Sequence, residues 1–395
     1  MDDLRYPTRK YPFFPLLVSF LIVVTVFGEG PSWFSYLIYL GYFGGLLYVL
    51  FQGIHFDIWA LLFVLYLPLN IVFTNPDPVF RPWERLIAFV LMFVFCFYPL
   101  ESINVTVFRN KVLKCLLFFC IIISVISFFC YFLNINLFED RYYGGYLSDF
   151  KEHAGHFSGI TKHSMLLGPI SGLSIIYLLD SFLKNKRLIT ILLLVLCFAS
   201  LIFSASRAAI ISTLSGVTLS FIFSKQITKQ GAISILLIIL VLFFSFIFSP
   251  YISDVVSKHD NVELGRFDTR TEKVAARISE FNTDPLIGYG FMAIDPNNDE
   301  FDPLTGTIEP GSSWLAILSM TGILGLFLFL ILFVKCLKNS KKSSSFIYFA
   351  LIIFFSVHMI VEGYVFSSGN VLSCLLWLTL GCCYSDTIVE SIQEG

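Results

Sequence analysis

Residues 188–223 read LITILLLVLCFASLIFSASRAAIISTLSGVTLSFIF, an apolar run that is interrupted by SASR and carries a single charge, Arg207. One unbroken helix over this run would be about 54 Å long, which is too long for one bilayer crossing. Basic segments flank the run on both sides, KNKR before it and SKQITKQ after it. If both flanks lie on one side of a membrane, the chain reverses at SASR and Arg207 lies at the opposite surface.

The rest of the chain has the same apolar character. Of its 395 residues, 56% are hydrophobic and 14% are charged, the mean hydropathy is +0.80 and the net charge is −2. Globular domains carry roughly 25% charged residues, so this composition excludes an ordinary soluble protein. The apolar runs do not alternate with a period of two, which excludes a transmembrane barrel. The sequence therefore predicts an all-α polytopic membrane protein.

Twelve transmembrane helices are expected. They cover about residues 13–27, 33–51, 56–73, 86–100, 112–133, 164–183, 188–204, 208–223, 231–249, 312–334, 346–366 and 371–384. With the N-terminus in the cytoplasm, the inward-facing segments carry most of the 26 Lys and Arg residues, whereas the short outward loops carry only Arg81, Arg85 and Arg207. This asymmetry follows the positive-inside rule and places both termini in the cytoplasm. The first span has no small-residue cleavage site and is interpreted as an anchor.

Two outward segments are longer than ordinary connections. The expected organisation is helices 1–5 in residues 1–133, a first outward loop at 134–163, helices 6–9 in 164–249, a large outward loop at 250–311, and helices 10–12 with a short tail in 312–395. The large loop is mainly acidic, so its arginines stand out. All nine cysteines lie in expected spans or on the inner side, and no disulfide is expected.

An amphipathic helix is expected in the large loop at DTRTEKVAARISEF, residues 268–281. Thr269 and Glu272 form a capping box. Three apolar residues follow helical spacing, namely Val274, Ile278 and Phe281. Arg270 would be the first helical residue, where a helix N-terminus favours anions such as phosphate. Pro285 and the glycines that follow are expected to end the helix and return the chain to the membrane.

Arg207 and Arg270 thus lie on separate outward elements, and they predict a site for a lipid-borne phosphate or diphosphate at the outer membrane surface. The two guanidinium groups would stabilise the charge that grows on a departing diphosphate. Glu309 or His163 would take a proton from an attacking hydroxyl. This chemistry needs neither a metal nor another cofactor. Two further candidates for diphosphate binding are Arg266 and Lys162.

Each of these residues also has a structural interpretation. Arg207 could reach lipid headgroups from a helix end, and Arg270 could pair with Asp268 or Glu272 within the loop. Glu309 could cap the tenth span, because a carboxylate is favoured at a helix N-terminus. His358 and Glu362, one turn apart on the eleventh span, are candidates either for function or for hydrogen bonding between helices.

Motifs of soluble enzymes are absent from the sequence. There is no phosphate-binding loop of the form G-x-x-x-x-G-K-[ST] and no H-E-x-x-H zinc motif. The histidines of the first long loop are not spaced like a common metal site. These are His153, His156 and His163. The chain is therefore not expected to use nucleotide energy or a bound metal itself.

Four stretches, taken in order, resemble the O-antigen polymerase and ligase superfamily of bacterial inner membranes. They are GHFSGITKHSMLLG (155–168), LIFSASRAAIIS (201–212), TRTEKVAARISEFNTDPLIGYGF (269–291) and SSWLAILSMTGILGLFLF (312–329). They are similar to the family's Gly-x-Phe-x-Gly stretch, its Ser-Arg motif, its loop arginine followed by Pro-Leu-Leu-Gly-x-Gly, and its entry to the next span. The resemblance covers roughly residues 150–330, around one long outward loop.

The resemblance implies a GT-C-like membrane glycosyltransferase that uses undecaprenyl-diphosphate-linked oligosaccharides, with Arg207 and Arg270 at the diphosphate. A polymerase moves the growing glycan onto the next lipid-linked repeat unit, and a ligase moves it onto lipid A-core. The family's ligase histidine is missing here, because Gly311 and Ser312 stand at its position, and this favours the polymerase. A lipid-linked oligosaccharide flippase is a third alternative, but a transporter should carry midplane charges or paired broken helices.

The same resemblance implies where the chain works and with what. The expected location is the bacterial inner membrane, with the site on the periplasmic side. The expected partners are the lipid-linked oligosaccharide, membrane lipids, and a chain-length regulator and flippase of the same pathway, with no nucleic acid. The sugars, their linkage and the type of surface polysaccharide are not encoded in any pattern described above.

Overall fold

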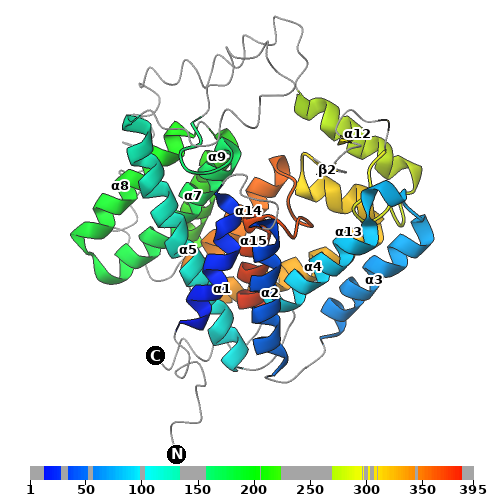
Figure 1. The fold of residues 1–395 in the computed structure, drawn as a ribbon, viewed down its shortest axis with the longest axis horizontal. Coiled ribbons are helices and arrows are strands. Elements are labelled where there is room, and N and C mark those ends of the chain that lie inside the picture. Colours follow the sequence, from blue (N-terminus) through cyan, green and yellow to red (C-terminus); the bar gives the residue numbers. More distant parts are fainter. Residues whose placement is uncertain are drawn as a thin grey trace, which may run out of the picture.

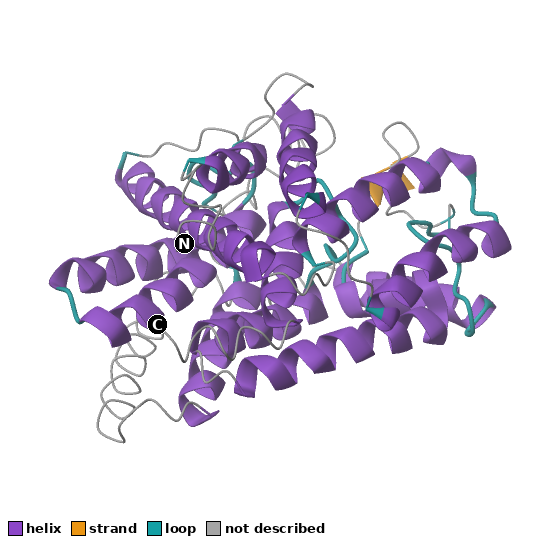
Figure 2. Ribbon diagram, turned by 90° about the horizontal axis from the view of Figure 1, so that it is seen from below, coloured by secondary structure: helices purple, strands orange, loops and turns teal. Residues whose placement is uncertain are grey.

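The apolar runs form helices in the computed structural model, which describes residues 13–27, 34–51, 57–97, 103–133, 157–204, 206–223, 269–295, 297, 301–302, 307–308, 310–342 and 346–384 (Figures 1 and 2). The helices are α1 (Phe14–Val23), η3 (Val24–Val26), α2 (Phe34–Leu50), α3 (Ile58–Thr74), η4 (Pro78–Phe80), α4 (Pro82–Cys96), α5 (Ile103–Phe132), α7 (Ser164–Asn185), α8 (Leu188–Phe203), α9 (Arg207–Phe223), α12 (Thr269–Thr283), α13 (Ser313–Lys342), α14 (Phe346–Val361) and α15 (Val371–Tyr384). Two short strands, β1 (Phe301–Asp302) and β2 (Thr307–Ile308), pair antiparallel.

The helices follow the expected spans closely. Each expected span except 231–249 coincides with an apolar helix, and 231–249 lies outside the described residues. Within the described ranges, three helices are long and apolar enough to cross a bilayer by length and composition, at 104–132, 164–185 and 313–342, and seven further apolar helices are 10–17 residues long. This architecture is compatible with a polytopic membrane protein. The short β1–β2 pair is an addition to the expected all-α fold.

Two helices are longer than the spans expected within them. α5 begins at Ile103 rather than near 112, and α13 continues to Lys342 rather than ending near 334. The added turns contain the basic segments FRNKVLK and KCLKNSKK, whose Lys and Arg residues are good helix formers. Hydropathy indicates the part of a helix that can lie in hydrocarbon, whereas backbone hydrogen bonding can extend the helix beyond that part.

α15 lies at the centre of the bundle, where it packs against α4, α5, α13 and α14 (Figure 1). All of its residues from Val371 to Tyr384 are buried. Trp377 contacts the rings of Phe93 and Phe97 edge to face, with centroids 5.0 and 5.4 Å apart. α8 is peripheral and packs on α5 and α7, while α3 packs on α4 and α13 on the other side. The apolar helix α15 is thus surrounded by other helices, with α5, α7 and α8 on one side and α3, α4 and α13 on the other.

A buried arginine connects α5 to the end of α4. The Nε of Arg109 donates to the carbonyl of Phe95 at 2.7 Å, and its Nη2 donates to that of Val94 at 2.9 Å. These carbonyls belong to the last turn of α4, where no intrahelical partner is available and the helix dipole is negative. The guanidinium group of Arg109 is therefore a structural cap for α4.

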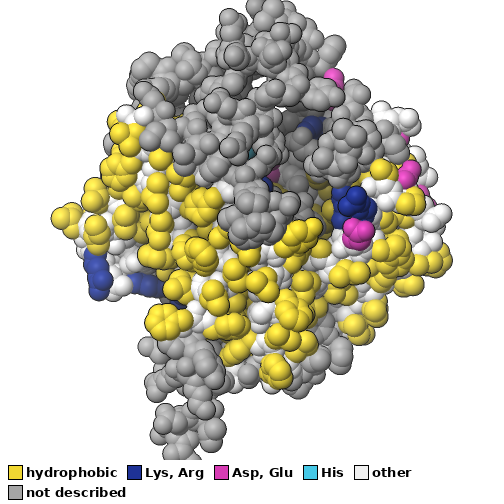
Figure 3. All heavy atoms as spheres, in the orientation of Figure 1, with side chains coloured by type: hydrophobic (Ala, Val, Ile, Leu, Met, Phe, Trp, Pro, Cys, Tyr) yellow, Lys and Arg dark blue, Asp and Glu magenta, His cyan; other side chains and the backbone are white. Residues whose placement is uncertain are grey.

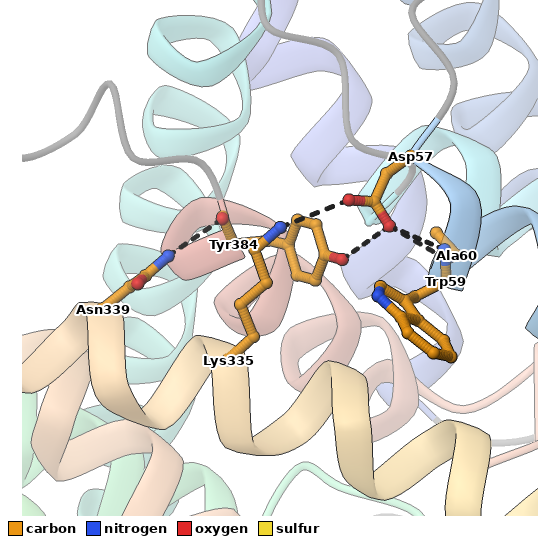
Figure 4. Close-up of polar contacts among 6 residues, drawn as sticks. All are labelled: Asp57, Trp59, Ala60, Lys335, Asn339 and Tyr384. Carbon is orange, nitrogen blue, oxygen red and sulfur yellow. Dashed lines mark hydrogen bonds and ion pairs between the residues drawn. The ribbon is translucent and has the colours of Figure 1, made fainter.

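One end of the bundle is rich in lysine, and we call it the basic end. At this end Asp57 caps α3 through its Oδ1, which accepts from the N–H groups of Trp59 and Ala60 at 3.0 and 3.2 Å (Figure 4). The hydroxyl of Tyr384 donates to Oδ1 at 2.7 Å, and the Nζ of Lys335 lies 3.2 Å from Oδ2. The same Nζ lies 3.9 Å from the centroid of the Tyr384 ring. These contacts tie α3, α13 and α15 together.

The opposite end, which we call the loop end, holds the beginnings of α7, α9 and α13, with α12 packed beside α13 (Figure 1). Between the two ends, hydrophobic side chains cover much of the described surface (Figure 3). Many of them are large and exposed, among them Leu65, Phe129, Leu192, Ile211 and Phe327. An apolar girdle of this kind is expected where helices face lipid. All nine cysteines are free thiols, and all except Cys115 are buried.

Candidate functional site

The Ser-Arg turn forms the reversal that was predicted within residues 188–223. α8 ends at Phe203 and α9 begins at Arg207. The Oγ of Ser204 donates to the carbonyl of Leu201 at 2.7 Å, which closes the end of α8. The Oγ of Ser206 accepts from the N–H of Ala209 at 3.4 Å, as a serine does at a helix N-cap. The sequence S-x-S-R thus ends one helix and begins the next.

Arg207 is the first residue of α9, and its side chain is exposed. Within the described part of the chain it makes no ion pair and no side-chain hydrogen bond. The unpaired N–H groups and the positive end of the α9 dipole lie beside it. A permanently charged guanidinium at such a position can bind phosphate oxygens in a bidentate manner.

The packing of α9 places Arg207 relative to the other helices. α9 runs antiparallel to α14, because Gly216 packs against Ala350 and Phe354 and the ring of Phe221 lies 5.1 Å from that of Phe346. Arg207 precedes Gly216 by nine residues, so equal helical rise brings it level with residues 359–363 at the end of α14. The start of α9 and the end of α14 therefore share one level of the loop end.

The start of α13 lies at the same level. The carbonyl of Glu362 accepts from the N–H of Ser313 at 3.0 Å and from its hydroxyl at 2.7 Å. Ser313 also accepts from the N–H of Tyr364 at 2.9 Å, so it joins α13 to the segment between α14 and α15. Glu362 itself is half-buried. A carboxylate thus lies at the level of Arg207, where the sequence had left its role open.

α12 contacts this level through Lys273. A Cβ at Gly311 would lie 3.0 Å from the Cβ of Lys273, so the first turns of α12 pack directly against the residues that precede α13. Arg270 is three residues before Lys273, within the first turn of α12. The backbone of Arg270 is described but its side chain is not, and Arg266 and Glu309 lie outside the described residues. In Figure 3, charged and histidine side chains are visible between the α9 and α12 sides of this face.

The buried face of α12 differs from the predicted one. Val274 and Ile278, expected on an apolar face against the protein, are 40% and 47% exposed. The face against the protein instead carries an ion pair between the Nη2 of Arg277 and the Oε1 of Glu280, 2.9 Å apart, with both side chains at most 1% exposed. The same Oε1 accepts from the N–H of Asp295 at 2.9 Å. The hydrophobic spacing indicated the wrong face because the buried face of α12 carries two charged residues, Arg277 and Glu280, which pair with each other along the helix.

α12 is described from Thr269, and the residues before it lie outside the described ranges, so the capping box of Thr269 and Glu272 stays a prediction. The helix ends at Thr283, before Pro285, as expected from the proline and glycines that follow. The segment 285–291 after it, PLIGYGF, had only been expected to lead back to the membrane. It instead packs into a break in α13, and its GYGF glycines were too weak a pattern to reveal this beforehand.

His163 and Lys162 precede α7 at the loop end. His163 is the N-cap of α7, and its Nδ1 accepts from the N–H of Met165 at 2.9 Å. A backbone N–H can only donate, so the neutral ring carries its proton on Nε2 and its one lone pair is already used. This geometry disfavours His163 as the general base. Lys162 is exposed, and its backbone N–H donates to the carbonyl of Val26 at 3.2 Å.

His358 is buried on α14. Its Nδ1 lies 3.2 Å from the hydroxyl of Tyr364, and its ring stacks on that of Phe354 with centroids 5.4 Å apart. Phe354 lies on the same helix and Tyr364 in the segment that follows it, so these contacts are local, and hydrogen bonding between helices stays a prediction. As for metals, no group of three or more His, Cys, Asp or Glu side chains in the described ranges is arranged to hold an ion.

The position of the missing ligase histidine is closely packed. Gly311 lies against Lys273, as described above, and Ser312 is buried. The Oγ of Ser312 donates to the carbonyl of Met359 at 3.1 Å and accepts from the N–H of Leu315 at 3.4 Å. Ser312 therefore caps α13 and joins it to α14. The position of the ligase histidine is therefore occupied by a buried serine that caps α13 and bonds to α14.

Comparison with known families bears on the segment that contains these elements. Residues 192–330 match the family described as O-antigen ligase. The match spans α8, the Ser-Arg turn, α9, α12, the 285–291 segment and the first part of α13. A search of curated proteins finds no match to the chain. The family match gives no support to a flippase. The match at residues 192–330 is consistent with the O-antigen polymerase and ligase superfamily that the sequence motifs resemble.

Proposed function

We propose that the chain is a membrane glycosyltransferase that lengthens a surface polysaccharide at the periplasmic face of the inner membrane. Its donor is a growing glycan on undecaprenyl diphosphate, and its acceptor is the next lipid-linked repeat unit. The observation that carries this proposal is Arg207, an exposed guanidinium at the start of α9 that makes no ion pair with the described residues. It lies within the domain matched by the family.

The proposed reaction is a single displacement at the anomeric carbon. A hydroxyl oxygen of the acceptor sugar forms the new bond to that carbon, and the bond from the carbon to the diphosphate oxygen breaks, with inversion. Undecaprenyl diphosphate leaves with the electron pair, and Arg207 and Arg270 stabilise its charge. The acceptor hydroxyl loses its proton to a carboxylate.

Two carboxylates are candidates for this base. Glu309 immediately precedes Pro310 in the sequence, and Glu362 lies level with Arg207. Replacing each in turn by glutamine removes the charge at nearly constant size. The variant that lacks the base should lose about a hundredfold or more of the transfer rate at neutral pH. The other variant should retain most of that rate. Equal retention of activity in both variants would exclude a carboxylate base at these positions.

A ligase is the second candidate, because the matched family is described as O-antigen ligase. The ligase would transfer the same glycan onto lipid A-core. One observation favours the polymerase. The histidine of the ligase motif is replaced by Gly311 and Ser312, and Ser312 is buried as a cap of α13.

A strain that lacks this chain separates the candidates by the glycans it accumulates. A polymerase predicts lipid A-core that carries one repeat unit and no longer chains. A ligase predicts bare core together with polymer still attached to undecaprenyl diphosphate. Repeat units retained on the cytoplasmic face would contradict both and indicate transport. Gel separation of lipopolysaccharide, with extraction of lipid-linked glycans, measures all three outcomes.

A further inference from the structure

α13 is broken inside the bundle. Gly322 adopts φ 64° and ψ −170°, a conformation that interrupts the helix about nine residues, or roughly 14 Å, from its start. Only glycine adopts this region readily. In an unbroken helix, the N–H of Ile323 would donate to Ser319 and that of Leu324 would donate to Met320. Neither bond forms here, so four backbone groups need other partners.

The segment 285–291 supplies these partners. The N–H groups of Ile323 and Leu324 donate to the carbonyls of Pro285 and Leu286 at 3.0 and 3.3 Å. The carbonyls of Ser319 and Met320 accept from Tyr289 and Gly290 at 2.7 and 3.2 Å. Both missing helix bonds are thus replaced by four bonds to one inserted segment. Irregular backbone at this depth is tolerated only when its polar groups are satisfied in this way.

Asn70 of α3 fixes the inserted segment from the other side. Its Nδ2 donates to the carbonyl of Ile287 at 2.5 Å, and its Oδ1 accepts from the N–H of Phe291 at 2.6 Å. Because one partner can only accept and the other can only donate, both ends of the amide are required. Asn70 is 1% exposed in an otherwise apolar helix. A buried amide of this kind is costly unless it is fully bonded.

Tyr66, one turn before Asn70, contacts both α13 and the inserted segment. Its hydroxyl donates to the carbonyl of Thr321 at 2.6 Å and lies 3.3 Å from that of Ile287. We call this assembly the helix-break clasp: residues 285–291, Ser319–Leu324 of α13, and Tyr66 and Asn70 of α3. Within it, two polar side chains of α3 recognise backbone geometry that exists only when the segment is inserted.

The clasp is continuous with α12. Residue 285 follows the last residue of α12 by two positions, and the Oδ1 of Asp284 accepts from the N–H groups of Leu286 and Ile287 at 3.2 Å. On the far side of the clasp, Asp295 is bonded to Glu280, which pairs with Arg277 on α12. The segment therefore leaves α12, enters the break in α13 and returns to α12. Its position determines that of the whole helix, including Arg270 in the first turn.

We propose that Asn70 and Tyr66 are positioning residues for glycan transfer, which hold α12 and its Arg270 at the loop end by locking residues 285–291 into the break of α13. This inference rests on the proposed function for the role of Arg270. Asn70 and Tyr66 touch no reacting group. They act through the backbone that they hold.

The first experiment measures the clasp itself by hydrogen exchange of the full chain in lipid nanodiscs. Asn70→Leu keeps the volume but leaves the Phe291 N–H and the Ile287 carbonyl without their partner. Exchange at the amides of residues 289–291, 323 and 324 should rise about tenfold or more. Tyr66→Phe, a milder change, should raise exchange at the same amides by a smaller factor. Asn339→Leu removes a 3.0 Å bond to the Tyr384 carbonyl at the basic end of α13 and should leave exchange at these amides unchanged.

The second experiment asks whether the clasp acts through Arg270. Transfer efficiency, measured from the glycan chain length in cells, should fall about tenfold or more in Asn70→Leu. Asn339→Leu should retain activity. In an Arg270→Lys background, Asn70→Leu should cause little further loss, because the group that it positions is already impaired. A general loss of stability would instead multiply the two effects.

The outcomes separate the inference from the proposed function. Unchanged exchange at the clasp amides in both α3 variants overturns the clasp as a lock. Faster exchange with normal transfer, or multiplied losses in the double variant, overturns the positioning role. Full transfer activity in the two single variants Arg270→Lys and Arg207→Lys would contradict the proposed function. The hydrogen-exchange result would still test the clasp in that case.

Discussion

Two carboxylates near helix termini are paired at the basic end of the bundle, whereas Arg207 at the loop end is exposed. At the basic end, Asp57 pairs with Lys335, and Asp180 pairs with Lys184 at 2.7 Å. At the loop end, Arg207 is exposed and makes no ion pair with any residue that the structure describes. Both ends contain helix termini that a charge would stabilise. At the basic end that stabilisation comes from side chains of the chain itself.

This difference separates charges that maintain the fold from a charge that is available to a ligand. A paired carboxylate such as Asp57 joins α3, α13 and α15, so its loss should change stability. An exposed arginine at a helix start contributes little to stability and remains free to bind an anion. Substitution of Arg207 should therefore reduce activity, and substitution of Asp57 should reduce stability.

The largest effect is expected from Arg207→Lys. Lysine keeps the charge but loses the bidentate fork, so glycan transfer should fall about a hundredfold or more. The thermal unfolding midpoint should stay unchanged, because Arg207 has no described partner to lose. Arg187→Lys is the matched control, since Arg187 is an exposed arginine at the start of α8 on the basic end. Equal activity of the two variants would remove the functional distinction between the ends.

Arg270→Lys should cost somewhat less, about ten- to a hundredfold in transfer, because α12 also presents a helix N-terminus to the diphosphate. Glu272→Gln changes an exposed charge in the same turn and is the control. Transfer assays on matched amounts of membrane-inserted protein measure both. If Glu272→Gln were as inactive as Arg270→Lys, the loss would reflect the fold of α12 rather than its arginine.

Gly168→Ala tests the placement of Arg207 without changing a charge. A Cβ at position 168 of α7 would meet the side chains of Ser204 and Ser206, so the Ser-Arg turn must shift. We expect about tenfold lower transfer and a stability loss of about 1–3 kcal/mol. Gly44→Ala, where the nearest atom is 3.9 Å away, should be neutral or slightly stabilising. Normal transfer in Gly168→Ala would show that the turn tolerates displacement.

Asp57→Ala tests the basic end. The change removes the cap of α3, the bond from Tyr384 and the ion pair with Lys335, and it should cost about 1–2 kcal/mol of unfolding free energy. Glycan transfer per folded molecule should stay normal. Thermal unfolding in detergent together with a transfer assay measures the two quantities. Reduced transfer at full stability would contradict the structural role.

The smallest effect is a pH dependence at Asp57. Partial burial raises the pKa of this carboxyl, but the bonds from Tyr384 and Ala60 and the charge of Lys335 outweigh burial and leave the pKa below its usual value. The contribution of Asp57 is therefore present above its unfolded pKa of about 3.9 and is lost as the pH falls through the lower folded pKa. Asp57→Asn should flatten that part of the stability curve, as unfolding between about pH 2 and 5 would show.

Much of the fold follows from the sequence because hydropathy and turn chemistry are local properties. The apolar runs coincide with helices, and the SASR reversal lies between α8 and α9 as predicted. The basic flanks of α5 and α13 were read as loops because charge signals the limit of the membrane and not the limit of a helix. For the site, Arg207 lies at the turn between two helices as predicted, while its ligand and its side of the membrane remain proposals.

The remaining features depend on contacts between distant residues. The buried pair of Arg277 and Glu280 could not be anticipated, because two charges predict an exposed helix face. Asn70 lies in a plain apolar run 221 residues before Phe291, its hydrogen-bond partner. No local pattern connects such positions. The role of Glu362 likewise depends on the packing of α9 along α14.

The sequence by itself determined that this chain is helical and membrane-like, where α8 turns into α9, and which arginine that turn presents. Those properties come from the transfer free energy of single side chains and from capping within a few residues. Only the tertiary structure decided that Arg207 makes no ion pair with the described residues, that α12 buries an ion pair, and that α13 is broken around residues 285–291. Those properties depend on which backbone and side-chain groups find partners across the bundle, and burial makes every missing partner costly.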